Sequence, residues 1–159
     1  MTTEPREILF VCTGNICRSP VAQLLSERLA SEAGLSWKAS SAGVEAEIGK
    51  TMTPGASRTL ASRGIRGSKH IARQLDEGML AAADEVYALT RQHKAVIVSR
   101  FPRCAAKVKV LREAAGLPDA DIDDPYGESD SVYESCAVSI EEALNILIQR
   151  CHDHAEIPR

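Results

Sequence analysis

The chain has 159 residues, of which 44% are hydrophobic and 26% charged, proportions that are ordinary for a globular protein. Its 19 basic and 22 acidic side chains give a net charge of −3 with no basic block, which argues against nucleic acid or a membrane surface as a partner. No apolar run approaches the roughly 18–20 residues of a membrane-spanning helix, and the N-terminal segment lacks the apolar core of a signal peptide. We therefore expect a single cytoplasmic domain, residues 1–159.

Short apolar segments alternate with amphipathic ones along the chain. Strands are predicted near residues 6–11, 36–41, 85–89 and 107–111, and helices near residues 19–33, 54–63, 75–82, 91–99 and 130–153. This alternation is typical of an α/β fold, in which helices cover a parallel sheet and ligands bind at the carboxyl ends of the strands. The loop after the first strand and the loop that begins after Leu111 are therefore expected to meet.

Local signals indicate where the first two helices begin and end. Ser19 is a favourable N-cap residue, and Pro20 suits the first helical position. Gly34 can end the same helix. By the same reasoning, Pro54 is expected to begin the second helix and Gly64 to end it.

The chain contains five cysteines, an odd number that argues against a disulfide scaffold and favours a reducing compartment. Cys12 and Cys17 are separated by four residues, and no second pair has the spacing of a zinc site. No metal is therefore expected.

Residues 12–20 read Cys-Thr-Gly-Asn-Ile-Cys-Arg-Ser-Pro and connect the first strand to the first helix. A loop that enters a helix N-terminus presents backbone N–H groups and the positive end of the helix dipole to an anion. Gly14 permits a tight loop, and Arg18 adds a bidentate donor for phosphate oxygens. The same positive field favours the thiolate of Cys12, to which Ser19 can donate its hydroxyl. The pattern predicts a cysteine nucleophile beside a bound phosphate, and it disfavours the alternative of an inert buried thiol.

This segment resembles the phosphate-binding loop of the low-molecular-weight protein tyrosine phosphatase family. Three further segments resemble the family in the same order: Ser41-Ala42-Gly43, His70-Ile71-Ala72-Arg73-Gln74 and Asp124-Pro125-Tyr126. The resemblance implies a three-layer α/β sandwich with a central four-stranded parallel sheet in the order 2-1-3-4 and helices on both faces. It also implies an enzyme that needs no cofactor, acts on a phosphorylated protein, releases inorganic phosphate and exists as a monomer or weak dimer.

The resemblance implies three catalytic residues. Cys12 would attack phosphorus, Arg18 would hold the phosphoryl oxygens, and Asp124 would protonate the leaving group and later act as a base. Asp123 is a rival for the acid role, but Asp124 directly precedes Pro125, as in the family. The alternative is that residues 119–124 are only a solvated acidic loop or a calcium loop, although the spacing departs from the calcium-binding pattern.

Other residues are expected to contact the substrate or to support the loop. The expected contacts are Thr13, Gly14, Asn15, Ile16, Cys17, Ser19, Ile48 and Tyr126. The resemblance implies that His70 orients Asn15, that Asn15 holds the loop in a strained form, and that Ser41 joins this network. Cys17 either packs in the core or, as family precedent suggests, forms a reversible disulfide with Cys12 under oxidation.

Two branches of the family share this loop, one acting on phosphotyrosine and the other on phosphoarginine. Threonine typically follows the loop asparagine in the phosphoarginine branch, whereas this chain has Ile16, which is typical of tyrosine phosphatases. We therefore predict phosphotyrosine as substrate. A protein arginine phosphatase remains the alternative, because residues 90–94 resemble that branch and Tyr126 is followed by Gly127 rather than by a second aromatic residue.

Two further activities are disfavoured. Arsenate reduction needs two more cysteines on a mobile segment near the nucleophile, and Cys104, Cys136 and Cys151 lack the close spacing of such a relay. A non-catalytic phosphate-binding module would be expected to lack the nucleophile or the acid, and both are present.

Overall fold

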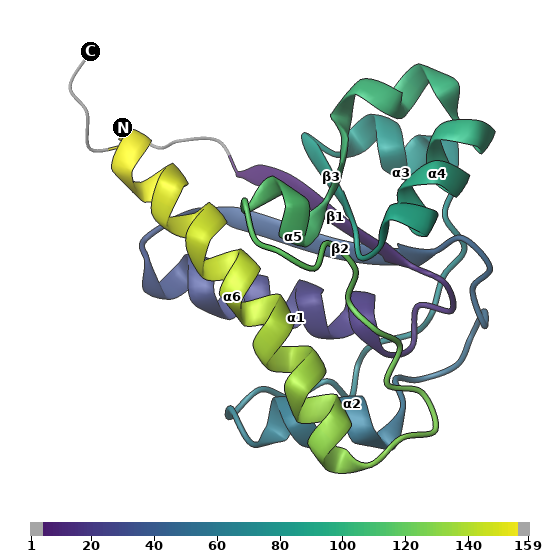
Figure 1. The fold of residues 1–159 in the computed structure, drawn as a ribbon, viewed down its shortest axis with the longest axis vertical. Coiled ribbons are helices and arrows are strands. Elements are labelled where there is room, and N and C mark those ends of the chain that lie inside the picture. The colour runs from purple at the N-terminus through teal and green to yellow at the C-terminus, as the bar shows by residue number, and fades with distance from the viewer. Residues whose placement is uncertain (1–4, 156–159) are drawn as a thin grey trace.

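Four parallel strands form one sheet in the order β2-β1-β3-β4 in the computed structural model of the protein, which describes residues 5–155 (Figure 1). The strands are β1 (Arg6–Cys12), β2 (Trp37–Gly43), β3 (Glu85–Ala88) and β4 (Val108–Val110). The predicted sheet order is confirmed. Residues 1–4 and 156–159 of the expected domain lie outside the described residues.

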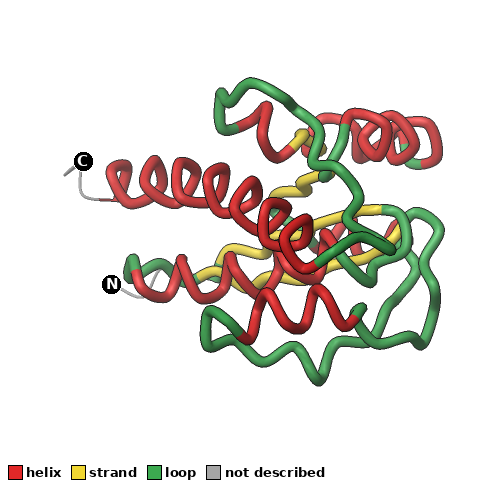
Figure 2. Tube along the Cα trace, turned by 60° about the horizontal axis from the view of Figure 1, so that its bottom comes forward, coloured by secondary structure: helices red, strands yellow, loops and turns green. Residues whose placement is uncertain are grey.

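Helices cover both faces of this sheet, which confirms the predicted three-layer sandwich (Figures 1 and 2). They are α1 (Arg18–Glu32), α2 (Pro54–Ala61), α3 (Glu77–Ala82), α4 (Arg91–Arg100), the 3-10 helix η1 (Pro102–Lys107), α5 (Leu111–Ala114) and α6 (Asp130–Ala155). Helices α1, α2, α5 and α6 contribute to the core on one face, and α3 and α4 to the core on the other.

Strand β1 is buried on both faces, which explains its continuous apolar sequence. Side chains alternate along a strand, so Ile8 and Phe10 face the core under α1 and α6. Leu9 and Val11 face the other core, where Ile97 of α4 packs. This two-sided burial fixes the end of the strand, at Cys12, in the middle of the sheet.

The start of α1 differs from the prediction. The helix begins at Arg18, and Cys17 occupies the N-cap position without a side-chain cap. The prediction of Ser19 as N-cap was wrong, because its hydroxyl lies in the first turn, 2.9 Å from the Cys12 sulfur. The predicted end is confirmed, since Gly34 follows the helix with a φ of +75°.

The other helix boundaries are close to those predicted. Pro54 is the first residue of α2, with Thr53 as its N-cap, and Gly64 follows the helix with a φ of +73°. Helix α3 begins two residues later than predicted because the Asp76 carboxylate accepts a hydrogen bond from the Met79 amide at 2.8 Å and caps it there.

Two short elements around the last strand were not predicted. Residues 102–107 form η1, and Leu111, expected at the end of the strand, begins α5. The strand β4 keeps only three residues between them. Such single-turn elements have too few residues to show a helical period in the sequence.

The loops that follow the strands gather at one end of the sheet, opposite the chain termini (Figure 2). In parallel sheets this carboxyl end is the usual place for ligands. Within residues 5–155, no helix is long and apolar enough to cross a membrane.

Candidate active site

The loop between β1 and α1 is held by its carbonyl oxygens. Amides of the segment after β2 donate three hydrogen bonds of 3.0 Å to it: Val44 to Cys12, Glu45 to Thr13 and Glu47 to Gly14. The Asn15 carbonyl accepts from His70 Nε2 at 2.7 Å, and the Ile16 carbonyl accepts from the Thr53 amide at 2.9 Å. Because N–H and C=O point in opposite directions across a trans peptide, outward carbonyls direct the loop amides inward. The loop is therefore shaped to surround an anion.

Gly43, at the end of β2, allows the close contact between this segment and the loop. A Cβ atom at Gly43 would overlap the carbonyl oxygen of Thr13. No other residue type could occupy the position without displacing the loop.

Asn15 supports the loop from beneath. It has a φ of +59°, in the left-handed region that asparagine adopts more readily than most residues with a side chain. Its buried side chain donates to Ser19 Oγ at 2.8 Å and Ser41 Oγ at 2.9 Å, and accepts from the Arg73 amide at 3.0 Å. His70 contacts the Asn15 backbone rather than its amide group. Four groups, from Ser19, Ser41, His70 and Arg73, thus hold Asn15 in this conformation under the loop.

Arg18 connects this loop to the loop after α5, and Cys12 lies beside Ser19. The Cys12 sulfur is 2.9 Å from Ser19 Oγ, at the bottom of the loop. The buried Arg18 side chain donates to the carbonyl oxygen of Ile122 at 2.9 Å, and its other terminal nitrogen is 3.7 Å from Asp124 Oδ2. The two loops expected to meet are therefore in contact, and Arg18 joins them.

The loop between β1 and α1, together with Asp124, lines a cavity of about 270 Å³. It is lined by Cys12, Thr13, Gly14, Ile16, Cys17, Arg18, Glu45, Glu47, Asp124 and Tyr126. Asp123, the rival acid, lines a different cavity, so the geometry favours Asp124.

Three of the residues expected to contact the substrate do not line this cavity. Asn15 and Ser19 are fully buried and do not line the cavity, since their side chains hold the loop from below. Ile48 is 71% exposed and also does not line it. The segment after β2 presents Glu45 and Glu47 to the cavity, and the alternate residues, including Ile48, fall outside. Contact of Ile48 with a substrate stays a prediction, and Glu45 and Glu47 are the residues of this segment that line the cavity.

The five cysteines are all free thiols, and they lie in different places. Cys17 lies 3.3 Å from Thr53 Oγ1 and 3.6 Å from the Tyr133 hydroxyl, and burial raises the pKa of its thiol. A disulfide with Cys12 stays a prediction. Cys104 belongs to the core on the opposite face of the sheet from Cys12, which argues against a three-cysteine relay.

His93, on α4, is a residue of this site that sequence reasoning missed. Its Nε2 atom lies 2.8 Å from Thr13 Oγ1, and its Nδ1 atom is buried without a hydrogen-bond partner among residues 5–155. Burial, followed by the charge of Arg18, lowers the pKa of His93 to about 4. The imidazole is therefore neutral near pH 7. Residues 90–94 were noted in the sequence only for their resemblance to the phosphoarginine branch, and nothing in that segment indicates a contact with the loop between β1 and α1.

This burial predicts an acid sensitivity that His93→Gln removes. Between pH 6.5 and 4 the unfolded state protonates His93 and the native state does not, so stability falls as pH falls. The contribution approaches ~3 kcal/mol across this window. Urea unfolding near neutral pH and near pH 4.5 should show a smaller acid loss for the variant, which retains an amide group near the position of Nε2. Equal losses in both proteins would contradict the assignment.

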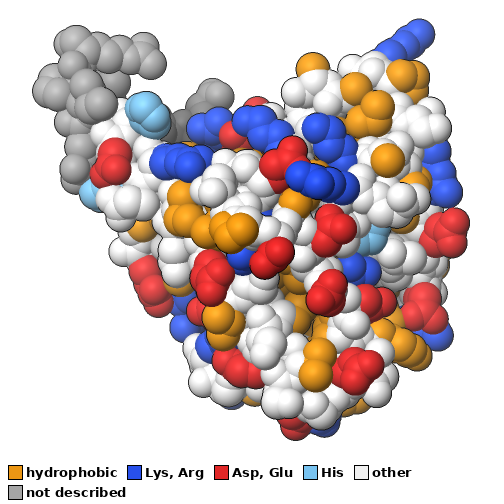
Figure 3. Space-filling view, in the orientation of Figure 1, with side chains coloured by type: hydrophobic (Ala, Val, Ile, Leu, Met, Phe, Trp, Pro, Cys, Tyr) orange, Lys and Arg blue, Asp and Glu red, His pale blue; other side chains and the backbone are white. Residues whose placement is uncertain are grey.

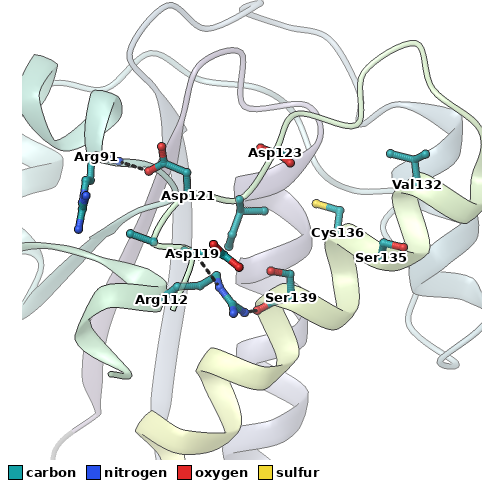
Figure 4. Close-up of a pocket in the computed structure, with 11 residues that line it drawn as sticks. Arg91, Arg112, Asp119, Asp121, Asp123, Val132, Ser135, Cys136 and Ser139 are labelled. Atoms are coloured by element: carbon teal, nitrogen blue, oxygen red, sulfur yellow. Dashed lines mark hydrogen bonds between the residues drawn. The ribbon is translucent and has the colours of Figure 1, made fainter. Parts of the chain in front are cut away.

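A larger cavity, of about 550 Å³, lies between the start of α4, residues 119–123 and α6 (Figure 4). The Arg91 amide donates to Asp121 at 2.8 Å, and the Arg112 guanidinium donates to the carbonyl oxygens of Asp119 and Ser139 at 2.9 Å each. Cys136 also lines this cavity, and burial raises the pKa of its thiol to about 12. No group of three or more His, Cys, Asp or Glu side chains in the described part of the chain is placed to hold a metal ion. Although this cavity is the larger of the two, Cys12 and Arg18 line the smaller one.

Comparison with known proteins agrees with the geometry. Residues 7–156 match the family described as "Low molecular weight phosphotyrosine protein phosphatase". The chain is 38% identical to a protein-arginine-phosphatase of Bacillus subtilis, over 91% of this chain and 95% of the relative. It is 34% identical to a low molecular weight protein-tyrosine-phosphatase of Streptomyces coelicolor, over 94% and 95% respectively.

Among solved structures, a low molecular weight protein tyrosine phosphatase from T. tengcongensis superposes with a TM-score of 0.88 at 38% identity, covering 91% of this chain and 99% of that one. A match over nearly the whole chain, together with the shared fold, leads to one conclusion. The protein belongs to the low molecular weight phosphotyrosine protein phosphatase family.

Proposed function

We propose that this protein dephosphorylates protein side chains through a phosphocysteine intermediate, and that phosphotyrosine is its substrate. The observation that carries the proposal is that Cys12, Arg18 and Asp124 line one cavity of about 270 Å³. A nucleophile, an anion-binding guanidinium and an acid are the three groups that phosphoryl transfer through cysteine requires.

In the first step the Cys12 thiolate attacks phosphorus and the bond from phosphorus to the tyrosine oxygen breaks. The inward loop amides and Arg18 hold the phosphoryl oxygens, and Asp124 gives its proton to the departing phenolate oxygen. Ser19, at 2.9 Å, donates its hydroxyl to the sulfur and favours the thiolate.

In the second step water attacks phosphorus of the phosphocysteine. Asp124, now a carboxylate, takes a proton from the water, and the sulfur leaves as a thiolate stabilised by Ser19. Inorganic phosphate is released, and Asp124 is again protonated for the next cycle. Every atom and proton of the two steps is thereby accounted for without a metal or cofactor.

The cavity walls support phosphotyrosine. Ile16 supplies a branched apolar side chain at the loop, and Tyr126, 62% exposed, supplies an aromatic ring at the rim. A flat aromatic leaving group can pack against both, and a polar one gains no hydrogen bond from Ile16.

Phosphoarginine is the second candidate. The 38%-identical Bacillus subtilis relative is named a protein-arginine-phosphatase. The carboxylates of Glu45 and Glu47 at the cavity also favour a cationic guanidinium over a neutral ring.

Peptides that carry phosphotyrosine or phosphoarginine between identical neutral residues distinguish the two candidates. We expect a higher kcat/KM for phosphotyrosine. Ile16→Thr should lower the tyrosine-to-arginine ratio of kcat/KM by about tenfold, because it exchanges an apolar contact for a hydroxyl. Ile71→Thr, the same change at an exposed position outside the cavity, is the matched control. A ratio that is equal in wild type and Ile16→Thr would exclude Ile16 as the selecting residue.

The proposal extends to a single phosphatase domain that acts in the cytoplasm as a monomer or weak dimer. Five free thiols support a reducing compartment. Sedimentation of the purified protein measures its oligomeric state.

A further inference from the structure

The wall of the active-site cavity contains more negative charge than an anion site requires. Three of its ten lining residues are carboxylates, Glu45, Glu47 and Asp124, against one guanidinium, that of Arg18. Asp124 has a catalytic role in the proposed mechanism, but Glu45 and Glu47 have none. Acidic side chains are also numerous over the lower part of the face shown in Figure 3. Carboxylates beside a phosphate site repel a phosphate dianion and attract a positive charge carried by the substrate.

Glu45 and Glu47 are fixed relative to the phosphate-binding loop. Their amides donate 3.0 Å hydrogen bonds to the carbonyl oxygens of Thr13 and Gly14. Between them, the Ala46 amide donates to Gln74 Oε1 at 2.9 Å. The backbone of both residues therefore belongs to the frame of the loop, and their side chains extend from it toward solvent.

Each carboxylate has a cation partner on its outer side. Glu47 Oε1 lies 2.7 Å from Lys50 Nζ, and Glu45 Oε1 lies 3.5 Å from the Arg100 guanidinium. The second oxygen of Glu47 faces the loop, 3.7 Å from where a Cβ atom at Gly14 would stand. Both carboxylate residues line the cavity, whereas Lys50 and Arg100 do not.

We propose that Glu45 and Glu47 form a cation-recognition wall, which binds a positively charged group of the substrate next to the phosphoryl group. This inference rests on the proposed phosphatase function and specifies its substrate class. The positive group has two possible sources. It is the guanidinium of a phosphoarginine side chain, or it is a lysine or arginine next to a phosphotyrosine in the peptide chain.

The test compares wild type with the double variant Glu45→Gln/Glu47→Gln, and with each single variant. The substrates are a phosphoarginine peptide with neutral flanks, a phosphotyrosine peptide with neutral flanks, and a phosphotyrosine peptide with flanking arginines. We expect the double variant to lower kcat/KM for a cationic substrate, relative to the neutral phosphotyrosine peptide, by about 3- to 10-fold. Added salt should weaken the wild-type preference in the same direction.

Glu32→Gln is the matched control for each single variant, because Glu32 is exposed at the opposite end of α1 and the substitution removes the same single charge. A shift confined to the phosphoarginine peptide assigns the guanidinium as the source, and a shift confined to the arginine-flanked phosphotyrosine peptide assigns the neighbouring side chains. Unchanged ratios for all substrates in the double variant overturn the inference. Hydrolysis of p-nitrophenyl phosphate by wild type is measured alongside, since its absence would instead contradict the phosphatase function itself.

Discussion

Cys12→Ser is expected to abolish turnover of p-nitrophenyl phosphate, with kcat reduced by more than about 10⁴-fold. The proposed mechanism needs an anionic nucleophile, and a serine hydroxyl is not ionised near neutral pH. Steady-state kinetics at high enzyme concentration measure the loss. Substantial remaining turnover would mean that Cys12 is not the nucleophile.

The same variant should still bind inorganic phosphate. The loop amides and Arg18, which hold the anion in the proposed mechanism, are unaltered, and a buried oxygen replaces a buried sulfur of similar size. Titration calorimetry with inorganic phosphate separates loss of chemistry from loss of the loop. Cys151→Ser, the same substitution at a half-buried position on α6, controls for the chemical change.

Asp124→Ala is expected to lower kcat by roughly 10²–10⁴-fold with phenyl phosphate. The phenolate that leaves in the first step is a poor leaving group unless it is protonated, so the loss should be smaller with p-nitrophenyl phosphate, whose leaving group is a weaker base. Comparing the two substrates therefore tests proton donation and not only the presence of a carboxylate.

Asp123→Ala is the matched control for this variant. Asp123 is the neighbouring residue in the same loop, but it lines the larger cavity and not the one that contains Cys12. If Asp123→Ala slowed phenyl phosphate hydrolysis as much as Asp124→Ala, the assignment of the acid would be wrong.

The parts of the site that follow one another in the chain were predictable. Residues 12–18 place the proposed nucleophile Cys12, Gly14 and Arg18 in one short loop, and strand–helix alternation predicts that this loop lies at the carboxyl end of the sheet. The loop after β4 was predicted to meet it, and the Arg18–Asp124 contact of 3.7 Å shows that it does.

The parts that depend on side-chain direction or on distant contacts were not predictable. Ser19 is a good capping residue by type, yet its hydroxyl contacts Cys12 and Asn15. In the segment after β2, backbone hydrogen bonds to the loop decide which residues face the cavity. Glu47 lines the cavity and its neighbour Ile48 does not, a difference of a single position that the sequence does not indicate. His93 contacts Thr13 across 80 residues of sequence, and no local pattern reports such a contact.

The hydrogen bonds from residues 44, 45 and 47 to the loop carbonyls couple the anion site to an edge strand, since β2 lies at the border of the sheet and leads directly into that segment. The free energy needed to hold the loop open around an anion is therefore supplied when the chain folds, and none of it is drawn from substrate binding. Binding energy then remains available for the transition state. Local opening of β2 would therefore remove three of the five hydrogen bonds described above to the loop carbonyls, while the central strands β1 and β3 stayed paired.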